Sequence, residues 1–168
     1  MTRKYLFVLI IFLAFFQISC LKNNLNECDY SPCKFVAPAA EITAISNYLA
    51  ANNLTATQHC SGVFYSVSNP GTGKQPNACG SVNVKYTGKL TNGNIFEQKV
   101  TDAVGIDLSR VINGWRIGIP LLKEGGSMTL YIPPFMGYGS QDMKDANGNT
   151  VIPANSTIIF TIELTAVL

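Results

Sequence analysis

The sequence predicts an α+β fold, with an antiparallel β-sheet, one short helix against one face of it, and another short helix before the domain. Three observations predict this fold. Segments of period-two hydrophobicity dominate residues 62–168, the helical pattern among them is confined to the surroundings of Trp115, and no crossover helix separates the strand pairs. With 168 residues, 47% of them hydrophobic, the chain has enough apolar material for one domain plus extensions.

Residues 1–19 have the pattern of a signal peptide. Arg3 and Lys4 precede an apolar run over 5–16, which is shorter than the roughly 20 residues that a membrane-spanning helix needs. The letters QISC that follow resemble a bacterial lipobox, although Gln17 stands where leucine is usual, and they predict a lipid on Cys20. Ordinary secretion, with Cys20 as an unmodified thiol, is the alternative.

Residues 20–40 are expected to form the lipidated cysteine and a flexible tether, because LKNNLNE after Cys20 is polar and rich in asparagine. The predicted location is the bacterial cell envelope, with the lipid holding the protein to a membrane. Leu21 is not the aspartate that retains many lipoproteins at the inner membrane, so the outer membrane is expected.

Four further cysteines suggest two disulfides in an exported chain, with three possible pairings. We expect Cys28 to pair with Cys33 and Cys60 with Cys79. A metal site is the alternative, but the chain has no Cys-x-x-Cys pair and His59 is its only histidine, which we place in a surface loop. No metal and no cofactor are therefore expected.

Residues 41–61 are interpreted as a helical pre-domain segment. In AAEITAISNYLAANN the side chains of Ile42, Ile45 and Leu49 fall on one face of a helix, which indicates a packing element. The domain proper then runs over 62–168, and we expect it to be monomeric.

Strand patterns follow in four places. GVFYSVS and SVNVKYTG alternate apolar and polar residues, and TNGN supplies an Asn-Gly hairpin turn before Ile95 and Phe96. SMTLYIPP and STIIFTIEL give two further strands, both after the short helix at Trp115, and the second runs almost to the C-terminus.

Several classes of function are excluded. Apart from Arg3 and Lys4, the basic residues balance the 10 acidic ones, and no basic run interleaves with aromatics, so nucleic-acid binding is not expected. The chain has no G-x-S-x-G elbow, no H-E-x-x-H and no phosphate-binding glycine loop. Its abundant aromatic and β-branched residues near turns suit chemistry that needs an apolar pocket and hydrogen bonds, and rotation about an X–Pro bond is such a reaction.

Four motifs in order, from about Gly62 to Leu168, resemble the FKBP-type peptidyl-prolyl cis-trans isomerase family. VNVKYTGKLTNGNIFE is similar to V-x-V-x-Y-x-G-x-L-x-x-G-x-x-F-D, and VINGW to V-I-x-G-W. IPPFMGYG resembles I-P-P-x-x-x-Y-G, and VIPANSTIIFTIEL resembles the closing strand of the family. The resemblance implies a strongly curved antiparallel sheet wrapped around a short helix, with a pocket between them.

The resemblance also implies the site residues. Trp115 would form the pocket floor beneath the substrate proline, Tyr138 would offer its hydroxyl to a substrate carbonyl, and Ile152 would offer its backbone N–H. The expected catalytic residues are Tyr86, Phe96, Glu97, Trp115 and Tyr138, and the expected substrate-binding residues are Val111, Ile112, Ile152 and Phe160.

Three departures from the family pattern affect this assignment. Glu97 replaces the usual aspartate, the aromatic residue expected before VINGW has only Val104 or Ile106 as counterparts, and SQDMKDANGNT is longer than the usual loop. The expected function is isomerisation of X–Pro bonds in unfolded or partly folded exported proteins. A non-catalytic peptide-binding chaperone module with the same fold is the alternative.

Overall fold

The computed structural model describes residues 28–168. The predicted signal peptide, Cys20 and the first part of the tether lie outside the described residues. Among the described residues no helix is both long and apolar enough to cross a lipid bilayer.

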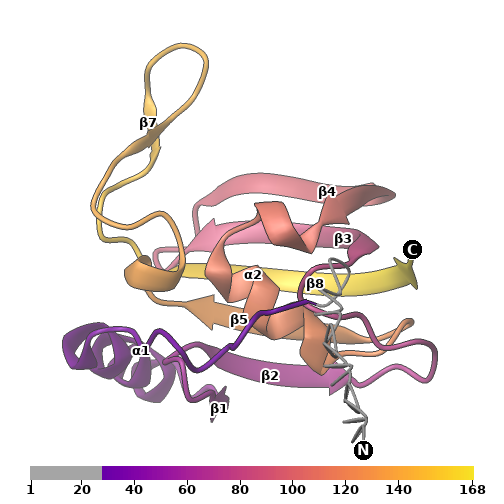
Figure 1. Ribbon diagram of the computed structural model, residues 1–168. Helices are drawn as coiled ribbons and strands as arrows, with labels where there is room; N and C mark the ends of the chain where they lie inside the picture. Colours follow the sequence, from indigo (N-terminus) through magenta and orange to yellow (C-terminus); the bar gives the residue numbers. More distant parts are fainter. Residues whose placement is uncertain (1–27) are drawn as a thin grey trace, which may run out of the picture.

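The core of the structure is a six-stranded, fully antiparallel sheet (Figure 1). Its order is β1 (Thr57–Gln58), β2 (Phe64–Asn69), β5 (Ser127–Ile132), β8 (Ile158–Val167), β3 (Ser81–Leu90) and β4 (Ile95–Asp107). A separate hairpin of β6 (Met143–Lys144) and β7 (Thr150–Ile152) projects from the body (Figure 1). The predicted antiparallel α+β architecture is confirmed, and the long loop of the sequence is this hairpin.

Helix α2 (Asn113–Gly118) lies against the inner face of the sheet. It is preceded by the 3₁₀ helix η1 (Leu108–Arg110) and followed directly by η2 (Ile119–Leu121), in which Pro120 ends the α-helical geometry. Gly114 and Gly118 face the sheet one turn apart, and a Cβ atom at either position would lie 2.5 Å from Ile132 or Leu130. The two glycines therefore allow α2 to approach β5 more closely than any other residue would permit.

Helix α1 (Ala39–Ala51) covers part of the opposite, outer face of the sheet (Figure 1). Ile45 and Leu49 are buried against Phe64, Tyr131 and Ile159, which come from β2, β5 and β8. These strand residues alternate with the ones that face α2, so both faces of the sheet are covered at this end. The expectation that helix covers only one face is wrong for this reason.

The segment after α1 also differs from its prediction. The helix ends at Ala51, and residues Thr57–Gln58 form the edge strand β1, paired with β2. The end of the predicted helical pre-domain segment, 41–61, is thus part of the sheet.

The disulfides pair Cys28 with Cys79 and Cys33 with Cys60. All four predicted cysteines are used, but the expected pairing was wrong, because proximity in sequence does not decide which cysteines meet in the fold. Both bridges join the segment before α1 to the domain. Residues 28–33 of the predicted flexible tether are consequently held to the domain.

We expect Ile45→Ala to lower the free energy of unfolding by about 2–4 kcal/mol, because the side chain is fully buried between α1 and the sheet. Asn47→Ala, on the exposed face of the same helix, should change it by less than about 0.5 kcal/mol. Urea unfolding followed by circular dichroism measures both. Equal effects of the two substitutions would contradict the packing of α1 on the outer face.

Candidate functional site

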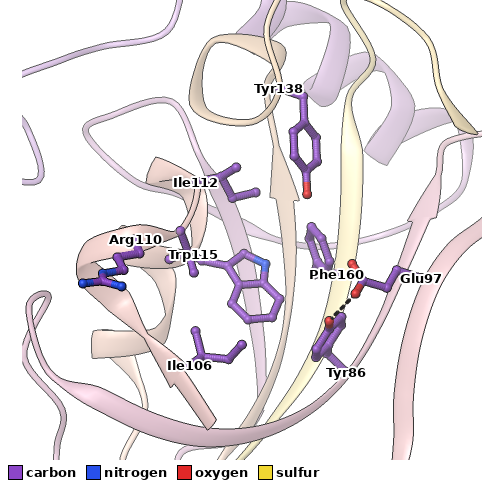
Figure 2. Close-up of a pocket in the computed structure, with 9 residues that line it drawn as sticks. Tyr86, Glu97, Ile106, Arg110, Ile112, Trp115, Tyr138 and Phe160 are labelled. Carbon is purple, nitrogen blue, oxygen red and sulfur yellow. Dashed lines mark hydrogen bonds between the residues drawn. The ribbon is translucent and has the colours of Figure 1, made fainter. Parts of the chain in front are cut away.

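A pocket of about 240 Å³ opens between α2 and the inner face of the sheet (Figure 2). Strands β3, β4 and β8 supply one side of it, the segment from η1 to α2 the other, and the turn after η3 (Pro134–Met136) supplies Tyr138. Its lining residues are Tyr86, Glu97, Ile106, Arg110, Val111, Ile112, Trp115, Tyr138 and Phe160.

Three aromatic rings form the floor, with Trp115 nearly perpendicular to each of the other two. The ring centroid of Trp115 lies 5.0 Å from that of Phe160 and 4.9 Å from that of Tyr86, each at nearly 90°. Such edge-to-face pairs are favoured by the ring quadrupoles. Because all three side chains are at least 93% buried and brace one another, the floor is rigid and apolar.

A β-bulge in β4 turns two adjacent residues toward the same side. Gly88 of β3 pairs with Glu97 and Lys89 with Ile95, so Phe96 is the extra residue. The Phe96 ring packs edge-on against Phe160, with 5.6 Å between ring centroids, while the Glu97 carboxylate reaches into the pocket. Gly88 makes room for this packing, since a Cβ atom there would lie 2.6 Å from both phenylalanine rings.

The carboxylate of Glu97 accepts a hydrogen bond of 2.7 Å from the hydroxyl of Tyr86 (Figure 2). Burial raises the pKa of the Tyr86 hydroxyl, and the hydrogen bond and negative charge of Glu97 raise it further. The extra methylene of Glu97 relative to the usual aspartate thus leaves the carboxylate able to contact a pocket tyrosine.

Tyr138 points its hydroxyl into the pocket from the side opposite Tyr86 (Figure 2). Burial raises the pKa of this hydroxyl, and the charge of Glu97 adds to the effect. No hydrogen bond from the Tyr138 hydroxyl occurs within residues 28–168, so it is a neutral donor directed at the cavity.

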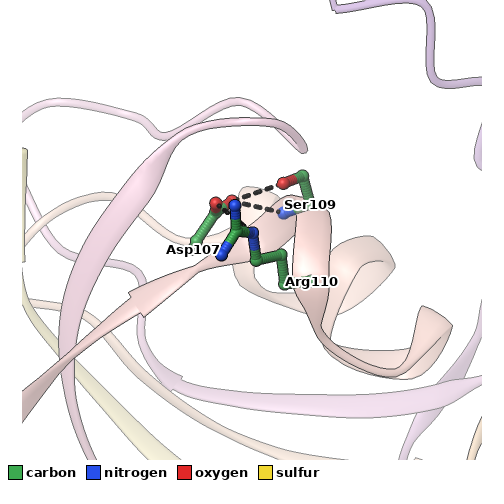
Figure 3. Close-up of polar contacts among 3 residues, drawn as sticks. All are labelled: Asp107, Ser109 and Arg110. Atoms are coloured by element: carbon green, nitrogen blue, oxygen red, sulfur yellow. Dashed lines mark hydrogen bonds and ion pairs between the residues drawn. The ribbon is translucent and has the colours of Figure 1, made fainter.

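Asp107 fixes the rim of the pocket at η1 (Figure 3). Its carboxylate accepts hydrogen bonds from the backbone N–H of Ser109 at 2.9 Å and from the Ser109 hydroxyl at 2.6 Å, and it forms an ion pair of 3.4 Å with Arg110. The Ser109 donors hold the pKa of Asp107 below its ordinary value. This cap positions Arg110 and the following Val111 and Ile112 at the mouth of the pocket.

The structure brings together seven of the nine predicted site residues: Tyr86, Glu97, Val111, Ile112, Trp115, Tyr138 and Phe160. Phe96 lies behind Phe160 and does not line the cavity, and Ile152 is buried in the core. The sequence reasoning did not identify Arg110, which has no signal beyond its position beside Val111. Of the two candidates for the missing aromatic residue, Ile106 is the one that lines the wall.

The groups that line this pocket suit desolvation and hydrogen bonding. Its lining includes no cysteine, serine or histidine, and its carboxylate is engaged by Tyr86. The indole N–H of Trp115 is buried and has no hydrogen-bond partner within residues 28–168, so it is an unsatisfied donor in the floor of the pocket. The one cluster of possible metal ligands in this part of the chain, Cys33, His59 and Cys60, lies outside the pocket and has both sulfurs in a disulfide.

The chain is similar in sequence to proteins of one known family. The family model for FKBP-type peptidyl-prolyl cis-trans isomerase matches residues 73–165. The FKBP-type peptidyl-prolyl cis-trans isomerase FkpA of Aeromonas hydrophila is 36% identical over 159 residues, which cover 88% of this chain and 56% of that protein. A probable FKBP-type peptidyl-prolyl cis-trans isomerase of Haemophilus influenzae is 39% identical over 106 residues, which cover 62% of this chain and 42% of that protein. The chain thus spans about half the length of these curated relatives.

Solved structures with a similar fold are found as well. The crystal structure of a peptidyl-prolyl cis-trans isomerase from Pseudomonas syringae pv. tomato superimposes with a TM-score of 0.65 and 31% identity, covering 78% of this chain and 96% of that one. The crystal structure of FkpA from Escherichia coli gives a TM-score of 0.64 and 32% identity, and the match covers 77% of this chain and 60% of that one.

The raised pKa of Tyr86 predicts a loss of stability in alkali. The folded protein keeps the Tyr86 proton at pH values where the unfolded chain, with a tyrosine pKa near 10, loses it. The contribution of Tyr86 to the free energy of unfolding is therefore fully present below about pH 10 and is lost as the pH rises above it. In Tyr86→Phe we expect the decrease in unfolding free energy between pH 9 and pH 11 to be smaller than in the wild type. Urea unfolding at several pH values measures the difference, and parallel curves for the two proteins would contradict it.

Proposed function

The chain belongs to the FKBP-type peptidyl-prolyl cis-trans isomerase family, and from this premise we propose that it accelerates cis-trans rotation about X–Pro bonds. The observation that carries the proposal is the pocket itself, with an aromatic floor at Trp115 and a neutral hydroxyl donor at Tyr138. Because the lining has no serine, cysteine or histidine and its carboxylate is hydrogen-bonded to Tyr86, the cavity suits a reaction that breaks no covalent bond.

The barrier to this rotation is about 18–20 kcal/mol and comes from the amide resonance that is lost when the bond twists. A twisted amide has less charge separation than a planar one. Transfer from water into an apolar cavity therefore costs the planar ground state more than the twisted state, which lowers the barrier. Each 1.4 kcal/mol gained in this way corresponds to about a tenfold increase in rate.

Each pocket residue has a proposed part in this process. The Trp115 and Phe160 rings would contact the proline ring, and Val111 and Ile112 would exclude water at the mouth. The Tyr138 hydroxyl would donate to the carbonyl oxygen of a substrate residue. Tyr86 and Glu97 would act as a bonded pair on the opposite side, and Phe96 would be a positioning residue that holds Phe160.

We place this activity in the bacterial cell envelope, with proline-containing exported proteins as substrates and a lipid on Cys20 as the membrane anchor. The leader pattern of 1–19, the QISC motif and the two disulfides support the proposal, since disulfides persist in oxidising compartments. The outer membrane as the site of anchoring is supported by Leu21 after the cysteine.

Binding of extended peptides without catalysis is the second function that this pocket could serve, because the wall at Ile106 is aliphatic where the family has an aromatic residue. The two functions differ in one observable, the rate of exchange between the isomers of a bound peptide.

We expect a soluble protein starting at Asn23 to accelerate cis-trans exchange in a short X–Pro peptide, measured by NMR exchange spectroscopy. Tyr138→Phe should lower kcat/KM by about three- to tenfold, the equivalent of one hydrogen bond lost in the transition state. Trp115→Leu should lower it by about tenfold or more, because the substitution removes the floor of the pocket.

Tyr48→Phe is the matched control, since it removes the same hydroxyl from α1, outside the pocket, and should leave kcat/KM unchanged. Folding of each variant is verified by circular dichroism. If the folded wild-type protein binds the peptide but leaves the exchange at its uncatalysed rate, the domain is a binding module.

The lipid anchor has its own test. In a bacterial host, the full chain should incorporate labelled fatty acid, and Cys20→Ser should abolish the label while the exported protein is still made. The label is detected on the purified protein after denaturing electrophoresis. A wild-type protein without label would show that Cys20 is not modified.

A further inference from the structure

The two disulfides lie in different surroundings. Cys28 and Cys79 are half-buried, and the guanidinium of Arg116 donates to the Cys79 sulfur at 3.3 Å and to the Ala78 carbonyl at 2.9 Å. The same guanidinium stacks over the Tyr30 ring, 4.0 Å from its centroid. This bridge is therefore shielded by neighbouring side chains.

The Cys33–Cys60 disulfide is exposed at both cysteines and has an imidazole beside it. The sulfur of Cys60 lies 3.5 Å from Nδ1 and 3.6 Å from Nε2 of His59. Neither His59 nor the disulfide lines the pocket, so the proposed isomerase activity assigns no role to them.

Ser61 fixes the protonation of the imidazole. Its backbone N–H donates to Nδ1 at 3.2 Å, and its hydroxyl oxygen lies 2.9 Å from the same atom. A backbone N–H can only donate, so Nδ1 is the acceptor in both contacts and the Ser61 hydroxyl donates to it, while the hydroxyl oxygen accepts from the backbone N–H of Val63. With Nδ1 an acceptor, the ring proton of His59 is on Nε2. In the intact disulfide the Cys60 sulfur is nearly equidistant from the two ring nitrogens, so it can align with Nε2–H once the S–S bond has opened and the side chain has turned.

We propose that Cys33–Cys60 is a thiol–disulfide exchange site, with the thiolate of an unfolded polypeptide as its co-reactant. The thiolate attacks the Cys33 sulfur, a new S–S bond forms there, and the bond to Cys60 breaks. Cys60 leaves as a thiolate that accepts a hydrogen bond from Nε2–H of His59. A second thiolate of the polypeptide then displaces Cys33, so that the polypeptide dithiol is oxidised to a disulfide and the Cys33–Cys60 pair is reduced.

The choice of Cys33 as the attacked atom follows from the position of the histidine. Exchange is faster when the departing thiolate is the more stabilised one, and within residues 28–168 the imidazole of His59 has its hydrogen-bond-range contacts with the sulfur of Cys60 rather than with that of Cys33. Burial lowers the pKa of His59, which keeps the ring neutral with a single N–H to donate.

The residues after Cys33 suit an unfolded chain as the co-reactant. Phe35 and Val36 are more than half exposed, and they directly follow Lys34 in the sequence. The apolar side chains provide a contact for the hydrophobic segments of an unfolded polypeptide, and the cation favours approach of a thiolate.

The test compares the two disulfides within one molecule. The oxidised protein is incubated with reduced glutathione in the presence of EDTA, quenched with an alkylating reagent at short times, and analysed by peptide mass spectrometry. We expect Cys33–Cys60 to open at least tenfold faster than Cys28–Cys79, with glutathione on Cys33 and the alkyl group on Cys60. Opening of Cys28–Cys79 first, or glutathione predominantly on Cys60, would overturn the proposal.

Two variants make the test specific. His59→Gln should slow the opening of Cys33–Cys60 on the order of tenfold and leave Cys28–Cys79, the internal control, unchanged. A dithiol peptide with flanking leucines should react faster than glutathione at equal thiolate concentration, and Phe35→Ser should remove that advantage. An unchanged rate in His59→Gln, or a peptide no faster than glutathione, would contradict the assigned histidine or the assigned co-reactant.

The outcome is separable from that of the proposed isomerase. The exchange assay contains no proline substrate, and His59 lies outside the pocket, so His59→Gln should retain the wild-type rate of X–Pro isomerisation.

Discussion

The close approach of α2 to β5 is the constraint on which the rest of the site depends. Gly114 and Gly118 remove the side chains that would separate the helix from Ile132 and Leu130. Trp115, which lies between the two glycines and directly follows Gly114, packs edge-on against the rings of Tyr86 on β3 and Phe160 on β8. The glycine pair thus sets how closely α2 lies on the sheet, and with it the position of Trp115 in the floor of the pocket.

The β-bulge in β4 is the second feature on which the site depends, because it directs two consecutive side chains in a way that regular strand pairing does not. In a flat strand, Phe96 and Glu97 would point to opposite faces of the sheet. Because of the bulge, Phe96 packs against Phe160 while the carboxylate of Glu97 accepts a hydrogen bond from Tyr86. A charge in an apolar cavity is costly unless it is hydrogen-bonded, and the Tyr86 hydroxyl provides that bond. The pair therefore gives the pocket a fixed polar side without a group free to act as a base.

Much of this arrangement could be predicted from sequence because it follows local rules. Period-two patterns located the strands, and the Asn-Gly turn located the β3–β4 hairpin. The position of Trp115 in the pocket came from a motif. The apolar face of α1 with Ile45 and Leu49 was also predicted. What failed depends on contacts between segments far apart in the chain: the outer face of the sheet as the surface on which Ile45 packs, the pairing of Cys28 with Cys79, and the place of Arg110 at the mouth of the pocket. No periodicity encodes such contacts, since each requires the fold to exist first.

The two disulfides show how one short segment can serve both structure and chemistry. Cys28–Cys79 holds Tyr30 over Arg116, the residue after Trp115, so this bridge supports the side of α2 away from the sheet. Cys33–Cys60 lies five residues further along and is joined to the turn that precedes β2. If the second bridge opens, the first still holds the segment to the domain and α2 in place. The exposed bridge can therefore exchange thiols while Cys28–Cys79, half-buried and contacted by Arg116, still holds the segment to the domain.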